Sequence, residues 1–258
     1  MKQALIVVSF GSSSAETRAL TLDAVTADMK AAFPDMHVIQ AYTSEFIRKR
    51  LASEGIDIPN LPQCLEQLQA EGYDRIIVQP THLTLGEEYE SKIHPVVEAA
   101  SETGTVIAGE PLLADPNRYP QVLETLLQVF HPEEGEHLVL VGHGSPHRHN
   151  AVYAALQEMA DRGDLPIHIG VLENTDWPSF SDVEERLRMQ QASRVCLAPL
   201  LIAGGMHIHR EIAGEDNDSW KNRLQRMGLS VRTCLHGLGE YAPFRELYVD
   251  MVRSLSKR

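Results

Sequence analysis

Short apolar runs alternate along the chain with segments in which apolar residues recur every three or four positions. The short runs predict buried strands, because a sheet covered on both faces carries apolar side chains on both faces. They lie at about residues 3–9, 37–42, 75–79, 105–108, 137–142, 167–171, 194–198 and 230–234. Helical spacing is clearest at 16–33, 61–73, 119–130 and 243–255. This alternation predicts parallel βαβ units in an α/β fold.

The two halves of the sequence resemble each other. ALIVVSFGSSS near the start matches LVLVGHGSPH, with FGS at 10–12 opposite HGS at 143–145. RIIVQPTHLTLGEEYE, from Arg75, matches RVCLAPLLIAGGMHIH, from Arg194, at a constant offset of 119 residues. Aliphatic runs also match by chance, but a proline and a glycine after the strand match as well, which favours a duplication.

The division between the halves is predicted in the polar segment HPEEGE, which contains a proline and a glycine. We therefore expect an amino-terminal α/β half at 1–131 and a carboxyl-terminal half at 137–258. Two similar halves that face each other would enclose a cleft, lined by the loops that follow the strands.

Composition narrows the range of partners. The chain has 258 residues and a formal net charge of −13, which argues against nucleic acid or an anionic membrane surface as its main partner. No apolar stretch approaches the roughly 20 residues that span a bilayer, and the first residues lack a signal-type cleavage pattern. The three cysteines are scattered and form no C-x-x-C pair. The sequence thus predicts a cytoplasmic protein.

Three side chains with metal-binding chemistry follow strands of the second half. His143 follows the run at 137–142, Glu173 follows 167–171, and His207 lies shortly after 194–198. Open α/β sheets bind ligands at the carboxyl ends of their strands. Two imidazoles and one carboxylate gathered there suit a divalent transition metal with open coordination positions.

Other interpretations of these peptides are weaker. Taken singly, each of the three side chains is more often structural, and the histidine-rich loops SPHRHN and MHIH also suit adventitious metal binding. A histidine phosphatase needs an arginine where Gly142 stands, and Ser145 is not in a G-x-S-x-G elbow. Phosphate-loop and dinucleotide-binding glycine patterns are also missing from the sequence.

Glu88 is the counterpart of His207 in the first half under the 119-residue offset. It is a candidate to face the metal site from the other half. The alternative is an acidic residue in the first turn of a helix, where a carboxylate favours the helix dipole. The sequence leaves both open.

The chain resembles the anaerobic cobalt chelatases that act on sirohydrochlorin, within the class II tetrapyrrole chelatases, nearly from end to end. The resemblance rests on ALIVVSFGSSS, AYTSEFIRKRL, QPTHLTLGEEYE, GEPLL, LVLVGHGSPH, GVLEN, APLLIAGGMHIHREIAGEDNDSW and HGLGE, in this order. It implies two flavodoxin-like halves, each a parallel sheet of about four strands, with a cleft between them. It also implies His143, His207 and Glu173 as metal ligands. The second loop departs from relatives at Met206 and at Arg210-Glu211.

The resemblance implies Co²⁺ as a substrate metal and no organic cofactor. His143 is then the first choice for metal ligand and proton acceptor, with His207 or Glu88 taking over the role of base. Arg148 and Arg210 are candidates to hold carboxylates of the macrocycle. Phe10 and Ser12, opposite His143 and Ser145 in the repeat, are further substrate-contact candidates.

Two rival functions stay open. First-row divalent metals share these ligands, so a chelatase for Fe²⁺ or Ni²⁺ fits equally. A non-catalytic carrier of metal or tetrapyrrole would keep the fold without accelerating insertion. The apolar helix at 119–130 suits packing within one chain or between chains, so the sequence is compatible with a homo-oligomer.

Overall fold

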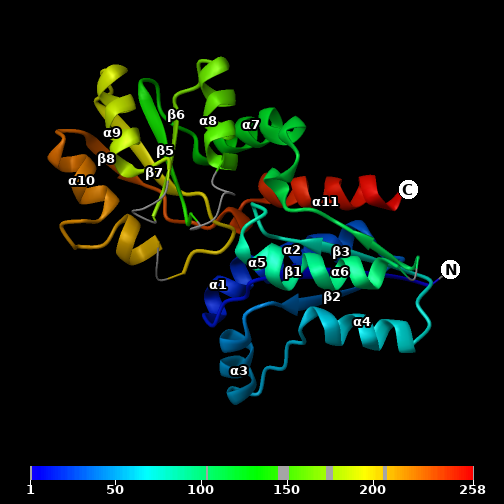
Figure 1. The fold of residues 1–258 in the computed structure, drawn as a ribbon. Helices are drawn as coiled ribbons and strands as arrows, with labels where there is room; N and C mark the ends of the chain where they lie inside the picture. Colours follow the sequence, from blue (N-terminus) through cyan, green and yellow to red (C-terminus); the bar gives the residue numbers. More distant parts are fainter. Residues whose placement is uncertain (1, 103, 145–150, 173–176, 206–207, 258) are drawn as a thin grey trace. The chain divides into compact units, whose positions relative to one another are not determined.

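The computed structural model describes residues 2–102, 104–144, 151–172, 177–205 and 208–257 (Figure 1). By its contacts the chain divides into two compact units. Unit 1 comprises Met1–Ala114 and Arg245–Arg258, and unit 2 comprises Asp115–Phe244. In the described residues, no helix is both long and apolar enough to cross a membrane.

Each unit is built on a parallel sheet of four strands. The sheet of unit 1 has the order β2-β1-β3-β4, and that of unit 2 has the equivalent order β6-β5-β7-β8. The strands are β1 (Gln3–Ser9), β2 (His37–Tyr42), β3 (Arg75–Pro80), β4 (Val106–Ala108), β5 (Glu136–Gly142), β6 (Ile167–Val171), β7 (Arg194–Pro199) and β8 (Ser230–Thr233). The eight predicted strands are confirmed, each boundary within one residue, and so is the two-sheet α/β architecture.

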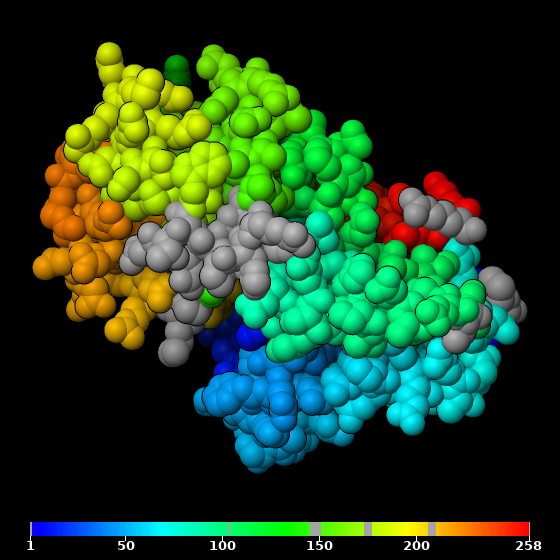
Figure 2. All heavy atoms as spheres, in the orientation of Figure 1, coloured from blue at the N-terminus to red at the C-terminus, as the bar shows by residue number. Residues whose placement is uncertain are grey.

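Helices flank both sheets. The α-helices are α1 (Ala15–Leu20), α2 (Leu22–Ala32), α3 (Glu45–Ser53), α4 (Leu61–Ala70), α5 (Glu87–Lys92), α6 (His94–Ser101), α7 (Tyr119–Phe130), α8 (Ala151–Arg162), α9 (Phe180–Met189), α10 (Trp220–Arg226) and α11 (Ala242–Ser256). Short 3₁₀ turns lie at η1 (Leu112–Ala114), η2 (Pro116–Arg118) and η5 (Leu238–Glu240), and η4 (Ile208–Ile212) is a π-helical turn. In the space-filling view, α3 and α4 form part of the surface of unit 1 and α9 and α10 part of that of unit 2 (Figure 2).

Local sequence explains where these helices begin. Asn60 starts α4 with a capping box, in which its side chain accepts the N–H of Gln63 and the Gln63 side chain accepts the N–H of Asn60. Ser179 and Asp182 form the same arrangement at the start of α9. Each box satisfies backbone donors that the first helical turn leaves without a partner.

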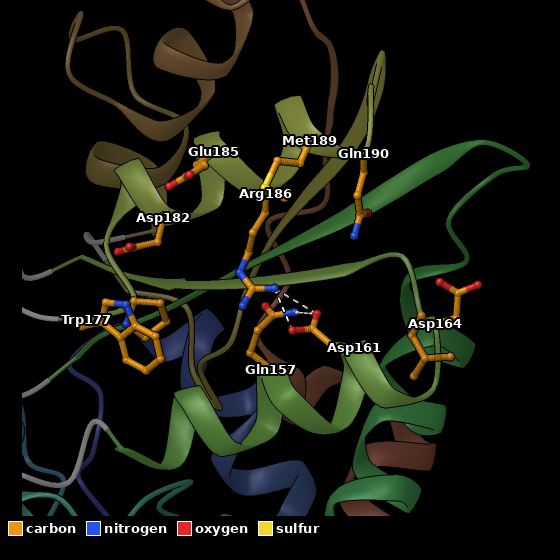
Figure 3. Close-up of a pocket in the computed structure, with 11 residues that line it drawn as sticks. Gln157, Asp161, Asp164, Trp177, Asp182, Glu185, Arg186, Met189 and Gln190 are labelled. Atoms are coloured by element: carbon orange, nitrogen blue, oxygen red, sulfur yellow. Dashed lines mark hydrogen bonds and ion pairs between the residues drawn. The ribbon is translucent and has the colours of Figure 1, made fainter.

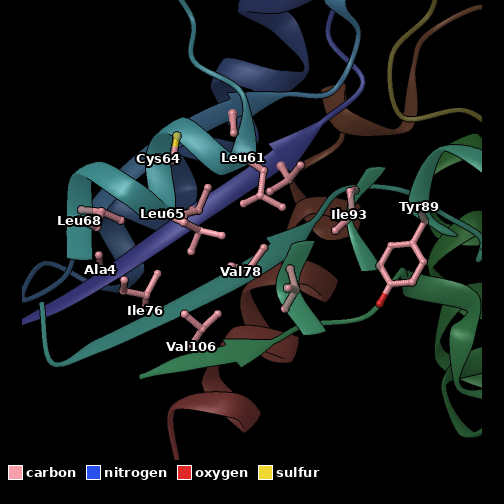
Figure 4. Close-up of a cluster of buried hydrophobic side chains, with 14 residues drawn as sticks. Ala4, Leu61, Cys64, Leu65, Leu68, Ile76, Val78, Tyr89, Ile93 and Val106 are labelled. Atoms are coloured by element: carbon pink, nitrogen blue, oxygen red, sulfur yellow. The ribbon is translucent and has the colours of Figure 1, made fainter. Parts of the chain in front are cut away.

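The core of unit 1 follows from the two-residue period of its strands. Alternate residues of β1 and β3 point to one face, where they pack against α4, α5 and α6 (Figure 4). The intervening residues Leu5, Val7 and Ile77 are also fully or almost fully buried. Both faces are therefore covered, which is why the strands read as continuous apolar runs.

The same register occurs in both sheets. Val8 of β1 lies opposite Pro80 of β3, and Val141 of β5 lies opposite Pro199 of β7. The loops after β3 and β7 repeat a further contact, in which Leu112 donates its N–H to the His82 carbonyl and Leu238 donates to the Leu201 carbonyl. These paired contacts support the duplication inferred from the sequence.

The last helix of the chain packs in unit 1, although it follows the strands of unit 2. Arg245 Nε of α11 lies 2.6 Å from Asp28 Oδ2 of α2, and the Tyr248 hydroxyl donates to the Thr81 carbonyl at 2.9 Å. Conversely, α7 follows β4 of the first sheet and belongs to unit 2. The contacts thus divide the chain differently from the predicted 1–131 and 137–258, because each sheet is followed by a helix that packs in the other unit. The predicted cleft between the halves stays a prediction.

Candidate active site

The carboxyl end of β5 delivers His143. Its side chain is exposed, and its Nδ1 lies 3.2 Å from the carbonyl oxygen of Gly144. A carbonyl only accepts hydrogen bonds, so this contact places the proton of the neutral ring on Nδ1. The lone pair then lies on Nε2, the form that a metal ion or a proton requires.

Glycines hold the turn around His143. Gly144 adopts a φ of 81°, which a residue with a side chain rarely adopts. A Cβ at Gly142 would lie 2.7 Å from Cε1 of Tyr153, so any other residue before the histidine requires the Tyr153 ring or the end of β5 to move. The arginine that a histidine phosphatase requires at this place would meet the same contact.

The segments that carry the other two predicted ligands leave the same edge of the sheet on either side of β5. Leu172, after β6, donates its N–H to the Gly142 carbonyl at 3.0 Å, and Leu200, after β7, donates to the Val141 carbonyl at 2.8 Å. Glu173 and His207 themselves lie outside the described residues, as does Arg148. Within the described ranges, no group of three or more His, Cys, Asp or Glu side chains is placed to hold one metal ion. The three-ligand site therefore stays a prediction.

Arg210 lies in the π-helical turn η4. Its side chain is 80% exposed, and its Nε lies 3.7 Å from Oδ2 of Asp216, itself 70% exposed. An exposed pair at this distance contributes little to stability. Arg210 is therefore able to exchange Asp216 for another anion.

The predicted residues of unit 1 also lie at strand exits. Phe10 follows β1 and is 50% exposed, which is unusual for a phenylalanine. Ser12 is partly buried, and its hydroxyl accepts the N–H of Ser14 at 3.3 Å. Glu88 lies in the first turn of α5, and its Oε1 lies 2.9 Å from Nζ of Lys92. The helix-start interpretation of Glu88 fits this contact, and a role toward the metal stays a prediction.

His82 is a residue that the sequence reasoning did not single out. It follows β3, and within the described chain neither of its buried ring nitrogens has a hydrogen-bond partner. Burial lowers its pKa to about 4, a shift that Glu88 opposes and Lys92 reinforces. The ring is therefore neutral near pH 7. The sequence carries one signal for this position. Under the 119-residue offset, His82 corresponds to Leu201, so a polar ring stands where the second half has an apolar side chain.

A second overlooked group follows β8. The Nδ1 of His236 lies 2.8 Å from Oε2 of Glu240, and the Oε1 of the same carboxylate accepts the N–H of Gly237 at 2.9 Å. The His236 side chain is 63% exposed. The sequence does carry a signal, since a histidine and a glutamate four residues apart follow a predicted strand in HGLGE.

A pocket of about 470 Å³ lies in unit 2 and is lined by residues of α8 and α9 (Figure 3). Its lining runs from Asp164, before β6, to Trp177, after it, and includes the ion pair between Arg186 and Asp161. The described lining contains none of the residues predicted for the active site. The pocket is lined by the elements that flank β6, and its described lining does not include His143.

Comparison with known proteins gives consistent results. Residues 3–257 match the family model described as cobalt chelatase (CbiK). The chain is 34% identical over 251 residues to a sirohydrochlorin cobaltochelatase of Salmonella typhimurium, covering 96% of this chain and 94% of that protein. It is 29% identical over 255 residues to sirohydrochlorin cobaltochelatase CbiKC of Nitratidesulfovibrio vulgaris, covering 96% and 89%. Among solved structures, SirB from Bacillus subtilis with Fe³⁺ has a TM-score of 0.63 at 17% identity, covering 99% of this chain and 96% of that one.

Proposed function

This chain belongs to the cobalt chelatase (CbiK) family, and we propose that it inserts Co²⁺ into sirohydrochlorin. The observation that carries the proposal is the match of residues 3–257 to one family, together with 34% identity to a sirohydrochlorin cobaltochelatase. The exits of β5, β6 and β7 at one edge of a sheet support it independently, because parallel sheets bind ligands there.

We propose that His143, Glu173 and His207 hold the incoming metal ion. Imidazole and carboxylate ligands suit cobalt, and three protein ligands leave positions at which ring nitrogens replace water. Soft thiolate ligands would hold the ion more tightly, and insertion requires release. The segments that follow β6 and β7 are each joined to the end of β5 by a backbone hydrogen bond, which supports this set of ligands.

Insertion also requires that pyrrole N–H protons leave the ring. In the neutral tautomer favoured by the Gly144 carbonyl, His143 presents a lone pair on Nε2. This nitrogen cannot bind the metal and accept a proton at once. We therefore assign the second role to His207 or Glu88, with proton transfer following the approach of the metal.

Sirohydrochlorin is a polycarboxylate, whereas the chain carries a formal net charge of −13. Local cations must offset this repulsion. We propose that Arg148 and Arg210 hold substrate carboxylates, since the guanidinium group pairs with them through two hydrogen bonds. Phe10 and Ser12, which follow β1, would contact the ring.

The decisive experiment is anaerobic absorption spectroscopy of sirohydrochlorin with Co²⁺, with and without the protein. We expect the wild type to accelerate formation of cobalt-sirohydrochlorin, and His207→Ala to lower the rate by about a hundredfold or more. His94→Gln, an exposed histidine on α6, serves as the matched control and should keep full activity. A folded wild type that gives only the spontaneous rate would refute the chelatase and favour a carrier.

Metal preference belongs to the same experiment. Fe²⁺ and Ni²⁺ bind the same ligand types, so the three metals are compared at equal concentration. We propose that Co²⁺ gives the highest kcat/KM. A higher value for Fe²⁺ or Ni²⁺ would transfer the assignment to that metal and leave the chelatase mechanism intact.

The cellular setting is also a proposal. Cys64, Cys196 and Cys234 are free thiols, which suits a reducing compartment such as the cytoplasm. The strongly acidic composition favours a small-molecule partner over nucleic acid or an anionic membrane. A measurement of the molecular mass in solution would test whether the chain forms a homo-oligomer.

A further inference from the structure

We propose that His236, oriented by Glu240, is a docking ligand that captures the divalent metal ion before it reaches the insertion site. This inference rests on the proposed function for the identity of the metal. Its structural basis is a set of contacts that lie entirely within described residues of unit 2.

The imidazole of His236 has the geometry of a metal ligand. A carboxylate accepts only, so the 2.8 Å contact with Glu240 places a proton on Nδ1 and leaves the lone pair on Nε2. Histidines that bind metals commonly donate their other ring N–H to a carboxylate, which fixes the ring and raises its basicity. The carboxylate is itself fixed, because its Oε1 accepts the Gly237 N–H at 2.9 Å.

The group is also accessible. The His236 side chain is 63% exposed, whereas that of Glu240 is 22% exposed. Tyr241 packs edge-on against the imidazole, with ring centroids 6.3 Å apart, and its hydroxyl contacts the Cys234 sulfur at 3.2 Å. A metal ion from solvent therefore reaches the ring without displacing the chain.

The position links His236 to the insertion site. It follows β8, the neighbour of β7, and adjacent strands lie about 4.8 Å apart. Leu238 donates its N–H to the Leu201 carbonyl at 2.8 Å, and a Cβ at Gly237 would lie 2.8 Å from the Gly204 nitrogen. The turn of His236 thus packs directly on the segment that leads along the sequence to His207.

The test combines Co²⁺ binding with kinetics of the full-length protein. His236→Gln should raise the apparent KM for Co²⁺ at least about tenfold, because even the loss of a group that orients a metal-binding histidine costs about 10- to 100-fold in affinity. The kcat and the KM for sirohydrochlorin should not change, because the ring is not bound there. Glu240→Gln should act in the same direction. In this variant the amide oxygen accepts the Gly237 N–H, so the amide N–H₂ faces Nδ1 of His236. The neutral ring then carries its proton on Nε2 and has no lone pair there for a metal ion.

His94→Gln is the matched control, because His94 is also exposed and also lies near a carboxylate, with Nδ1 3.9 Å from Glu98 Oε2. It should leave the KM for Co²⁺ unchanged. If the dyad only braced its turn, His236→Gln and Glu240→Gln would lower the unfolding temperature without changing that KM, and the proposal would be overturned.

Co²⁺ titration monitored by visible absorption separates this inference from the proposed function. In a background that carries His143→Ala, Glu173→Ala and His207→Ala, which removes all proposed ligands of the main site, additional substitution of His236 should abolish the remaining weak Co²⁺ binding. Equal Co²⁺ binding with and without His236 overturns the docking ligand even if the wild type is an active chelatase. Loss of binding supports it even if chelation is not accelerated.

Discussion

His137 and His168 face each other across neighbouring strands of unit 2, with Nδ1 of His137 2.9 Å from Nε2 of His168. The two rings stack with centroids 5.1 Å apart. His168 is 1% exposed, and burial lowers its pKa to about 3, reinforced by His137 and Arg186. One ring nitrogen donates to the other, and burial lowers the pKa of both rings, which favours their neutral forms.

Acid should destabilise the protein through His168. The unfolded chain binds a proton near the ordinary value of 6.5, whereas the folded chain binds it only near 3. The contribution to stability is therefore complete above pH 6.5 and is lost as the pH falls toward 3. We expect a slope of about 1.4 kcal/mol per pH unit from this group in urea unfolding experiments. His168→Leu should flatten the slope, and an unchanged slope would contradict the assignment.

The side-chain amide of Gln157 closes the open edge of β6. Its Oε1 accepts the N–H of Ile169 at 2.7 Å, and its Nε2 donates to the Ile167 carbonyl at 2.9 Å. Gln157→Leu would leave both backbone groups buried without a partner, so we expect a loss of about 1–3 kcal/mol in the free energy of unfolding. Gln67→Leu, an exposed glutamine on α4, is the control and should cost far less. Equal costs would show that the edge contact does not stabilise the sheet.

Gly170 leaves space for the indole of Trp220. A Cβ at this position would lie 2.3 Å from Cη2 of Trp220 and 3.0 Å from Cγ2 of Val183. Gly170→Ala should therefore destabilise unit 2 by about 1–3 kcal/mol through overpacking, measured by thermal unfolding. The cost of Gly170→Ala in the free energy of unfolding should be smaller in a Trp220→Leu background than in the wild type. Equal costs in the two backgrounds would argue against a direct clash.

Gly142→Ala tests how closely the turn of His143 is held. Its Cβ would press on the Tyr153 ring, and relief of that contact requires the end of β5 to move. A displacement of about 1 Å is enough to cost about a hundredfold in rate. We expect chelation to fall by about that factor while the protein stays folded. Wild-type kcat in this variant would show that the position of His143 is not limiting.

Most of the fold was predictable because its central strands are buried on both faces and form continuous apolar runs. Even the short edge strand Val106–Ala108, in which only Val106 is buried, lies in such a run. Periodicity shows that a helix buries one face, but it does not show which sheet that face covers. The sequence pattern therefore could not predict that α7 belongs to unit 2 and α11 packs in unit 1.

The candidate site was predictable only in part. His143 lies at its predicted strand exit, whereas Glu173 and His207 lie outside the described residues and stay predictions. The lack of a partner for His82 depends on burial that no local pattern encodes. The contact of His236 with Glu240 was accessible in principle, because the spacing was visible, but its orientation depends on the Gly237 N–H.

The packing of α11 in unit 1 has a consequence for synthesis. Thr81, whose carbonyl accepts the hydroxyl of Tyr248, is translated 167 residues before its partner. Domains usually fold in the order in which they leave the ribosome. Here the unit that contains the first strand is translated first and completed last, so the nascent amino-terminal sheet waits, with one part of its surface uncovered, until the final helix arrives.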